Sequence, residues 1–173
     1  MTRAEWTTIA AKVNLLWPNA RWTAPTIRAG EDLVLDLEPE YVMGAVQSLA
    51  TEGKEFPPSV GQLRKRSIEL SEAANGLTPP DPDTALREVY DTIARFGSYR
   101  TPEFSHAAIY ATVEAMGGWQ AVCMDENPEA FRAHFMRLYG TCRARTERES
   151  LMPPAVRELL AGLNLRADRE LSQ

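Results

Sequence analysis

Apolar residues recur along most of the chain at the three- and four-residue spacing that is typical of amphipathic helices. Clusters of proline and glycine interrupt this pattern. Proline lacks a backbone N–H and clashes with the preceding helical turn, so these clusters are expected to separate helices. The pattern therefore predicts an all-α protein. The interruptions fall at residues 17–18, 24–25, 53–58, 76–82, 97–102, 117–118 and 152–154.

The first 74 residues are expected to form a small helical module. The segments 2–5 (Thr-Arg-Ala-Glu) and 59–62 (Ser-Val-Gly-Gln) match a capping box, in which the first and fourth residues satisfy each other's backbone N–H groups. Pro39 suits the first turn of a further helix. Three apolar stripes follow these starts: Trp6, Ile9, Ala10, Val13, Leu16 and Trp17; Tyr41, Val42, Ala45, Val46 and Leu49; and Val60, Leu63 and Leu70.

Residues 33–37 (Leu-Val-Leu-Asp-Leu) are the ambiguous part of this module. They fit either a short strand or the end of a helix, and the helix is the favoured interpretation.

Residues 75–82 are interpreted as a proline-rich linker. Three of the four positions 79–82 are prolines, which rule out a continuous helix and stiffen the chain toward an extended form. The alternative is a long surface loop within a single domain.

Residues 83–149 predict a second helical module. A first helix carries Leu86, Val89, Tyr90, Ile93 and Phe96, and Ser105 is expected to cap a second helix. Trp119 opens a short turn of helix, and Asn127-Pro128-Glu129 has the residues that begin a longer one. The helix after Ser105 carries the inward-facing residues Ile109, Val113 and Met116. The longer helix after residues 127–129 carries Phe131, Phe135, Leu138, Tyr139 and Cys142.

Residues 150–173 are expected to form a C-terminal amphipathic helix after Pro153-Pro154. An isolated helix of this length is marginal in water, so it should dock on the rest of the chain or on a partner. Its apolar stripe consists of Val156, Leu159, Leu160 and Leu163.

Composition excludes several classes of protein. Apolar residues are 44% and charged residues 25% of the chain, as in globular proteins, and no apolar run is long enough for a membrane-spanning helix. The N-terminus lacks the apolar segment of a signal peptide. Two cysteines, Cys123 and Cys142, cannot build a disulfide framework, so a reducing compartment is expected. The net charge of −5 argues against a general nucleic-acid coat.

The residues that carry enzyme chemistry are sparse. The soft metal ligands, His106, Cys123, His134 and Cys142, lack the paired spacing of zinc sites. No nucleophile elbow, metalloprotease motif or phosphate-binding loop is present. We therefore expect a protein without catalytic residues, metal or cofactor, which is not an enzyme.

Nucleic-acid binding rests on one compact basic run, Arg64, Lys65 and Arg66, in a segment that predicts a helix. Such a run can bind phosphates, with an affinity that falls as salt rises. The simpler interpretation is the solvated outer face of an amphipathic helix, because neither half of the chain is basic overall.

Protein-binding residues are sought among the aromatic and leucine side chains. Trp6, Trp17 and Trp119 fall on apolar stripes and are interpreted as core. Trp22 and Tyr99 lie in loop-like segments, and aromatic residues are common in interface hot spots. The strongest candidate for insertion into a partner's groove is the tail stripe of Leu159, Leu160 and Leu163.

The first module combines an aromatic-rich opening helix, the Trp17-Pro18 loop, a helix after Leu37-Glu38-Pro39 and the segment 56–63 (Phe-Pro-Pro-Ser-Val-Gly-Gln-Leu). In these features, above all the last, the first 70 residues resemble the N-terminal helical domain of phage-encoded loaders and inhibitors of replicative helicases. The second module looks like segments of small phage and prophage proteins, in Phe96-Gly97-x-Tyr99, Pro102-x-Phe104-Ser105, Gly117-Gly118-Trp119 and Phe135-x-x-x-Tyr139.

This resemblance implies a replication accessory protein in the cytoplasm of a bacterial host. Its partners would be a replicative hexameric helicase of host or phage, and an origin-bound initiator or single-stranded DNA that receives the helicase. In that family the part beyond the helical domain is flexible and engages the helicase, whereas residues 83–149 are expected to be folded here. Two alternatives stay open: a DNA-binding regulator or replication or packaging accessory that uses Arg64–Arg66, and an inhibitor of another host protein.

Overall fold

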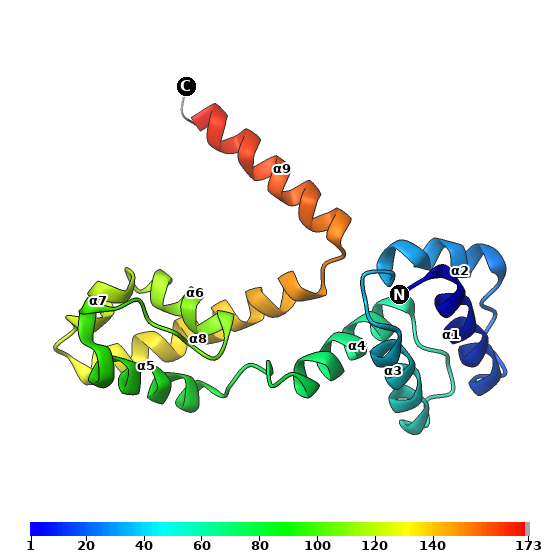
Figure 1. Cartoon of the computed structure of the whole chain (residues 1–173), viewed down its shortest axis with the longest axis horizontal. Helices are drawn as coiled ribbons and strands as arrows, with labels where there is room; N and C mark the ends of the chain where they lie inside the picture. The colour runs from blue at the N-terminus through cyan, green and yellow to red at the C-terminus, as the bar shows by residue number, and fades with distance from the viewer. Residues whose placement is uncertain (172–173) are drawn as a thin grey trace. The chain divides into compact units, whose positions relative to one another are not determined.

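The computed structural model describes residues 1–171, with side chains described for residues 1–163. Over this range the protein has nine α-helices, two short 3-10 helices and no strand, and it is 72% helical (Figure 1). The predicted all-α class is confirmed. Contacts divide the chain into two compact units, which are the N-terminal unit, Met1–Asn75 with Leu151–Gln173, and the central unit, Gly76–Ser150.

The helices of the N-terminal unit begin where local sequence signals favour them. Both predicted capping boxes are confirmed, one from Thr2 to Glu5 and the other from Ser59 to Gln62. Proline occupies the first turn of three helices, at Pro25, Pro39 and Pro154. The helices are α1 (Arg3–Leu16), α2 (Ala24–Gly30), η1 (Glu31–Leu33), α3 (Pro39–Thr51), α4 (Val60–Ala74) and α9 (Pro154–Leu171).

The core of the N-terminal unit lies between α1, α3 and α4. The buried tryptophans satisfy their indole N–H groups on backbone carbonyls: Trp6 donates to Ile27 at 2.8 Å and Trp17 donates to Lys54 at 3.0 Å. These bonds remove the penalty of burying an unpaired donor. The placement of Trp6 and Trp17 in the core is confirmed. The buried apolar side chains are Trp6, Ile9, Val13, Trp17, Val34, Val42, Ala45, Val46, Leu49 and Leu63.

The helix favoured for residues 33–37 is found only at their first residue, Leu33, and the alternative strand is wrong. The 3-10 helix η1 ends at Leu33, and a turn follows with Val34 fully buried. The carbonyls of Leu35 and Leu37 accept hydrogen bonds from the Met1 ammonium, at 2.8 and 2.7 Å. Because these long-range donors satisfy its carbonyls, the segment needs neither helical nor strand pairing.

The central unit packs its helices around a row of aromatic rings on α8. Phe131 stacks on Phe135 and Phe135 on Tyr139, with ring centroids 6.4 and 5.6 Å apart. The cysteine that was expected to extend this stripe, Cys142, is half-buried. The helices are α5 (Pro82–Phe96), η2 (Gly97–Tyr99), α6 (Ala107–Ala115), α7 (Trp119–Cys123) and α8 (Pro128–Leu151), whose last residue is assigned to the N-terminal unit.

The predicted cap of α6 is one residue off. Ser105 was expected to cap this helix, but the N-cap is His106, whose Nδ1 accepts a hydrogen bond from the backbone N–H of Ala108 at 3.0 Å. The backbone N–H and the hydroxyl of Ser105 donate instead to the carboxylate of Glu88 on α5. A long-range carboxylate thus competes successfully for the side chain that a local rule had assigned to capping.

The second half of the proline-rich segment is attached to the central unit. The hydroxyl of the fully buried Tyr139 donates to the carbonyl of Pro80 at 2.8 Å. Asp81 caps α5 by accepting from the backbone N–H groups of Asp83 and Thr84, at 3.1 and 3.0 Å. Residues 80–82 are therefore part of a folded unit, and only the stretch before Pro80 lacks such bonds among the described contacts.

Candidate functional site

Among the candidate metal ligands, His106 has a structural role as the N-cap of α6. In residues 1–163, no three His, Cys, Asp or Glu side chains gather in a way that could hold a metal ion. Burial raises the pKa of the Cys123 thiol, which favours the unreactive protonated form. Burial, and then the charge of Arg143, lower the pKa of His106, so its neutral ring can serve as the acceptor that caps α6.

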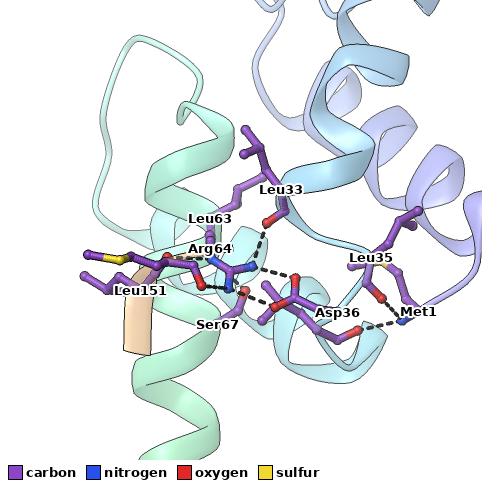
Figure 2. Close-up of polar contacts among 10 residues, drawn as sticks. Met1, Leu33, Leu35, Asp36, Leu63, Arg64, Ser67 and Leu151 are labelled. Carbon is purple, nitrogen blue, oxygen red and sulfur yellow. Dashed lines mark hydrogen bonds and ion pairs between the residues drawn. The ribbon is translucent and has the colours of Figure 1, made fainter. Parts of the chain in front are cut away.

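Arg64 lies inside the N-terminal unit, although the run Arg64–Arg66 was expected to face outward. Only 4% of Arg64 is exposed, and its guanidinium makes five hydrogen bonds (Figure 2). Nη1 and Nη2 hold the two carboxylate oxygens of Asp36, at 2.6 and 2.9 Å. The other three bonds go to backbone carbonyls: Nη1 to Leu33 at 2.8 Å, Nε to Leu151 at 2.7 Å and Nη2 to Met152 at 3.0 Å.

We call this group of contacts the Arg64 anchor: Arg64, Asp36 and the carbonyls of Leu33, Leu151 and Met152. It joins three segments that are distant in sequence, since Leu33 and Asp36 precede α3, Arg64 lies on α4, and Leu151 and Met152 follow the central unit. The planar guanidinium suits this task because its fork of donors has fixed directions. The anchor is thus the means by which the returning chain is attached to the N-terminal unit.

The inward position of Arg64 follows from the helical repeat of α4. Val60, Leu63 and Ser67 lie at the positions three to four residues apart that share a face with Arg64, and Leu63 and Ser67 are buried. The sequence contained a signal for this placement. Asp36 stands within the apolar run 33–37, and a carboxylate in such a run needs a buried or half-buried cation.

The carboxyl group of Asp36 is held in its ionised form. Its partial burial alone would raise its pKa, but the hydrogen bonds and charge of Arg64, with a further contribution from Arg157, lower the pKa below its ordinary value. The ion pair is therefore present at neutral pH.

The remaining members of the basic run do not form a positive patch. Arg66 pairs with Glu52 and Glu69, and Lys65 lies 3.8 Å from the same Glu69. With Arg64 buried and Arg66 paired, Lys65 is the one member that is both largely exposed and engaged only by a distant carboxylate. This arrangement offers little to a phosphate backbone.

The two aromatic candidates differ in their surroundings. Trp22 is half-buried and packs on the core, with its ring centroid 5.6 Å from that of Trp6. Tyr99, in contrast, is 96% exposed. The turn that carries it is held by the indole of Trp119, which donates to the Gly97 carbonyl at 3.1 Å, and Gly97 has a φ of +57° that favours glycine.

An apolar stripe of α9 is exposed in the N-terminal unit. We call it the apolar face of α9, and its members are Val156, Leu159, Leu160 and Leu163, which are 41% to 63% exposed. Four aliphatic side chains at helical spacing are unusual on a surface without a role in binding. This helix was expected to dock either on the rest of the chain or on a partner. These four side chains do not belong to either core cluster of the chain.

Phe56, which precedes Pro57 and Pro58 in the loop before α4, is also exposed, at 73%. Together with Trp17, Pro57 and Pro58 it lines a shallow hollow of about 340 Å³. The N-terminal unit therefore exposes apolar side chains both at the apolar face of α9 and at Phe56.

No helix among residues 1–171 combines the length and the apolar content that crossing a membrane requires. Comparisons with protein-family models, with curated proteins and with solved structures found no match.

Proposed function

We propose that this protein is a non-enzymatic phage replication accessory protein that binds a replicative hexameric helicase and loads or inhibits it. The observation that carries the proposal is the apolar face of α9, together with the resemblance of the first 70 residues to helicase loaders. An exposed aliphatic stripe at i, i+3, i+4 and i+7 fits a hydrophobic groove on a partner protein. The groove would belong to the helicase.

The nucleic-acid alternative has less support than the helicase proposal. It depends on the run Arg64–Arg66, in which Arg64 is buried and Arg66 is paired with carboxylates. The third function, inhibition of another host protein, would use the same apolar face of α9 and differs only in the partner.

The test is a binding measurement between the full-length protein and purified replicative hexameric helicases, taken in turn from the phage and from its bacterial host. We expect a stable complex whose affinity the double substitution Leu159→Asp with Leu160→Asp strongly weakens. The matched control is Leu15→Asp, because Leu15 is an exposed leucine on α1 of the same unit. Absence of a complex with every such helicase would contradict the proposal.

Two additional measurements define the action of the protein in that complex. Helicase ATPase and strand-separation rates distinguish loading, which raises them on naked DNA, from inhibition, which lowers them. A gel-shift titration with duplex and single-stranded DNA, repeated with Lys65→Ala, tests the nucleic-acid alternative. A salt-sensitive shift that Lys65→Ala weakens would favour it.

A further inference from the structure

The root of α9 is held by the same guanidinium that pairs with Asp36. Arg64 binds the carbonyls of Leu151 and Met152, and α9 begins two residues later at Pro154. On its other side Arg64 binds Asp36 and the Leu33 carbonyl, which belong to the turn packed against the core (Figure 2). One buried side chain therefore connects the start of α9 to the body of the N-terminal unit.

The segment between these carbonyls and the helix is stiff. Pro153 and Pro154 each have a fixed φ, and each restricts the residue before it to extended conformations. The Pro153 carbonyl then accepts from the backbone N–H groups of Val156 and Arg157, at 3.0 and 3.1 Å, which is the first turn of α9. Few free backbone torsions lie between the carbonyl of Met152 and the first turn of α9. The orientation of the backbone at Met152 therefore determines the direction of the helix axis of α9.

The described side chains of α9 give it no comparable support of their own. All those from Ala155 to Leu163 are exposed, and its four apolar members are absent from both core clusters. The described part of α9, up to Leu163, does not pack on either core cluster, so its position depends on the point at which the helix begins. For α9 that attachment is the Arg64 anchor and the two prolines.

We infer that Arg64 is a positioning residue for partner binding, which sets the direction in which the apolar face of α9 is presented. The inference rests on the proposed function, in which this face is the surface bound by the helicase. A helix that is already oriented in the free protein loses less freedom on binding, and this raises affinity without any new contact. Arg64 itself does not contact the partner, and it affects binding only through the position of α9.

The substitution Arg64→Lys tests the geometry of the guanidinium separately from its charge. The lysine ammonium retains the charge that pairs with Asp36, but it has no planar fork with which to hold three carbonyls and a carboxylate in different directions. Arg64→Lys therefore separates the ion pair from the attachment of α9. Arg64→Gln removes both, and Arg66→Gln is the matched control, because Arg66 lies on the same helix and pairs only with surface carboxylates.

The first experiment needs no partner. Hydrogen exchange of the full-length protein is followed at the backbone amides of Val156 and Arg157 in the wild type and in the three variants. We expect exchange at these two amides to be about tenfold faster in Arg64→Lys and in Arg64→Gln, because local opening at the root becomes more frequent. Arg66→Gln should exchange as the wild type does.

Amides in the middle of α3, such as those of Val46 and Leu49, report whether the unit is still folded. If Arg64→Gln exposes them as well, Arg64→Lys decides the question. Unchanged exchange at Val156 and Arg157 in Arg64→Lys, with α3 protected, would overturn the inference.

The second experiment measures affinity for the replicative hexameric helicase. Arg64→Lys should weaken binding by about tenfold, and it should add nothing further in the Leu159→Asp, Leu160→Asp background, because both changes act through α9. A purely structural role would not produce this non-additivity. Additive losses would overturn the inference. If the wild type binds no helicase, the proposed function fails, while the exchange experiment still decides whether Arg64 orients α9.

Discussion

The chain passes between its two units twice, at residues 75–76 and 150–151. In each unit one buried side chain binds the backbone next to one of these connections, but the two side chains do so with different chemistry. In the N-terminal unit Arg64 makes five bonds to Asp36 and three carbonyls, and two of those carbonyls follow the connection at 150–151. In the central unit the Tyr139 hydroxyl makes one bond, to Pro80, just after the connection at 75–76. The first attachment depends on charge, and the second does not.

This difference determines how much free energy of unfolding is lost when each side chain is removed. Removal of one member of a buried ion pair leaves the other charge without compensation, which is expensive. Removal of a phenolic hydroxyl leaves one neutral carbonyl that water or a small shift can satisfy. Burial raises the pKa of Tyr139 to about 12, so its hydroxyl keeps its proton throughout the neutral range. Four substitutions distinguish the charged attachment from the neutral one, and the replacement of Arg64 should cost the most.

Arg64→Ala should reduce the free energy of unfolding of the N-terminal unit by about 3 kcal/mol, because it leaves Asp36 unpaired and three carbonyls unsatisfied. Urea unfolding followed by tryptophan fluorescence measures this loss, since Trp6, Trp17 and Trp22 lie in that unit. Arg66→Ala is the control and should cost less than about 0.5 kcal/mol. Equal losses in the two variants would contradict the burial of Arg64.

Asp36→Asn should cost about 2 kcal/mol at neutral pH, because it keeps the shape of the side chain and removes the charge that strengthens both hydrogen bonds. The pKa of Asp36 is lowered in the folded protein, mainly by Arg64 against the opposing effect of burial. Its stabilising contribution is therefore present above the unfolded pKa of about 3.9 and is lost as pH falls through the lower, folded pKa.

Urea midpoints measured between neutral pH and acid pH check this dependence. The wild type should lose stability below about pH 4 more steeply than Asp36→Asn does. Parallel curves for the two proteins would mean that the carboxyl group is not ionised against Arg64.

Tyr139→Phe should reduce the free energy of unfolding of the central unit by about 1 kcal/mol, the value of one neutral hydrogen bond, since the ring keeps its stacking on Phe135. Because the hydroxyl does not titrate in this range, the loss should be the same at pH 5 and pH 8. The fluorescence of Trp119 reports on this unit. A cost as large as that of Arg64→Ala would remove the distinction between the two attachments.

His106→Asn should have the smallest effect and a characteristic pH dependence. Burial and Arg143 lower the pKa of His106, so the unfolded chain binds a proton more readily than the folded unit does. The stability of the central unit should therefore fall as pH drops below about 6.5. Asparagine can cap α6 without titrating, so the variant should lose this component of the pH dependence. Thermal unfolding at pH 5.5 and 7.5 measures the difference.

The helical class and many helix starts were predictable because they depend on neighbouring residues. A Ser or Thr with Glu or Gln three positions later, or a proline in a first turn, acts within one helical turn, and the pairs Thr2–Glu5 and Ser59–Gln62 behave accordingly. The tryptophans on apolar stripes are likewise placed by periodicity alone. Trp6 and Trp17 are buried, and Trp119 packs against the core of the central unit.

The errors share one physical cause, which is a partner far away in sequence. Ser105 binds Glu88, and the segment 33–37 is bound by Met1 and Arg64. Arg64 in turn binds Leu151 and Met152, which lie 87 and 88 positions further along the chain. No window of local sequence contains these partners. The contact of Trp22 with Trp6 likewise joins a loop residue to a distant helix. For Tyr99 and the apolar face of α9, the sequence predicted recognition surfaces, and the structure finds both exposed.

The attachment at Arg64 has a consequence for any attempt to divide this protein. The N-terminal unit is encoded in two pieces, and the 75 residues of the central unit lie between them as an insertion. A fragment cut at Asn75 would contain α1 to α4 and yet strip Arg64 of the two acceptors supplied by residues 151 and 152. The better minimal version is an excision, in which a glycine-serine linker replaces the central unit between Asn75 and Leu151 and keeps the second piece with the first.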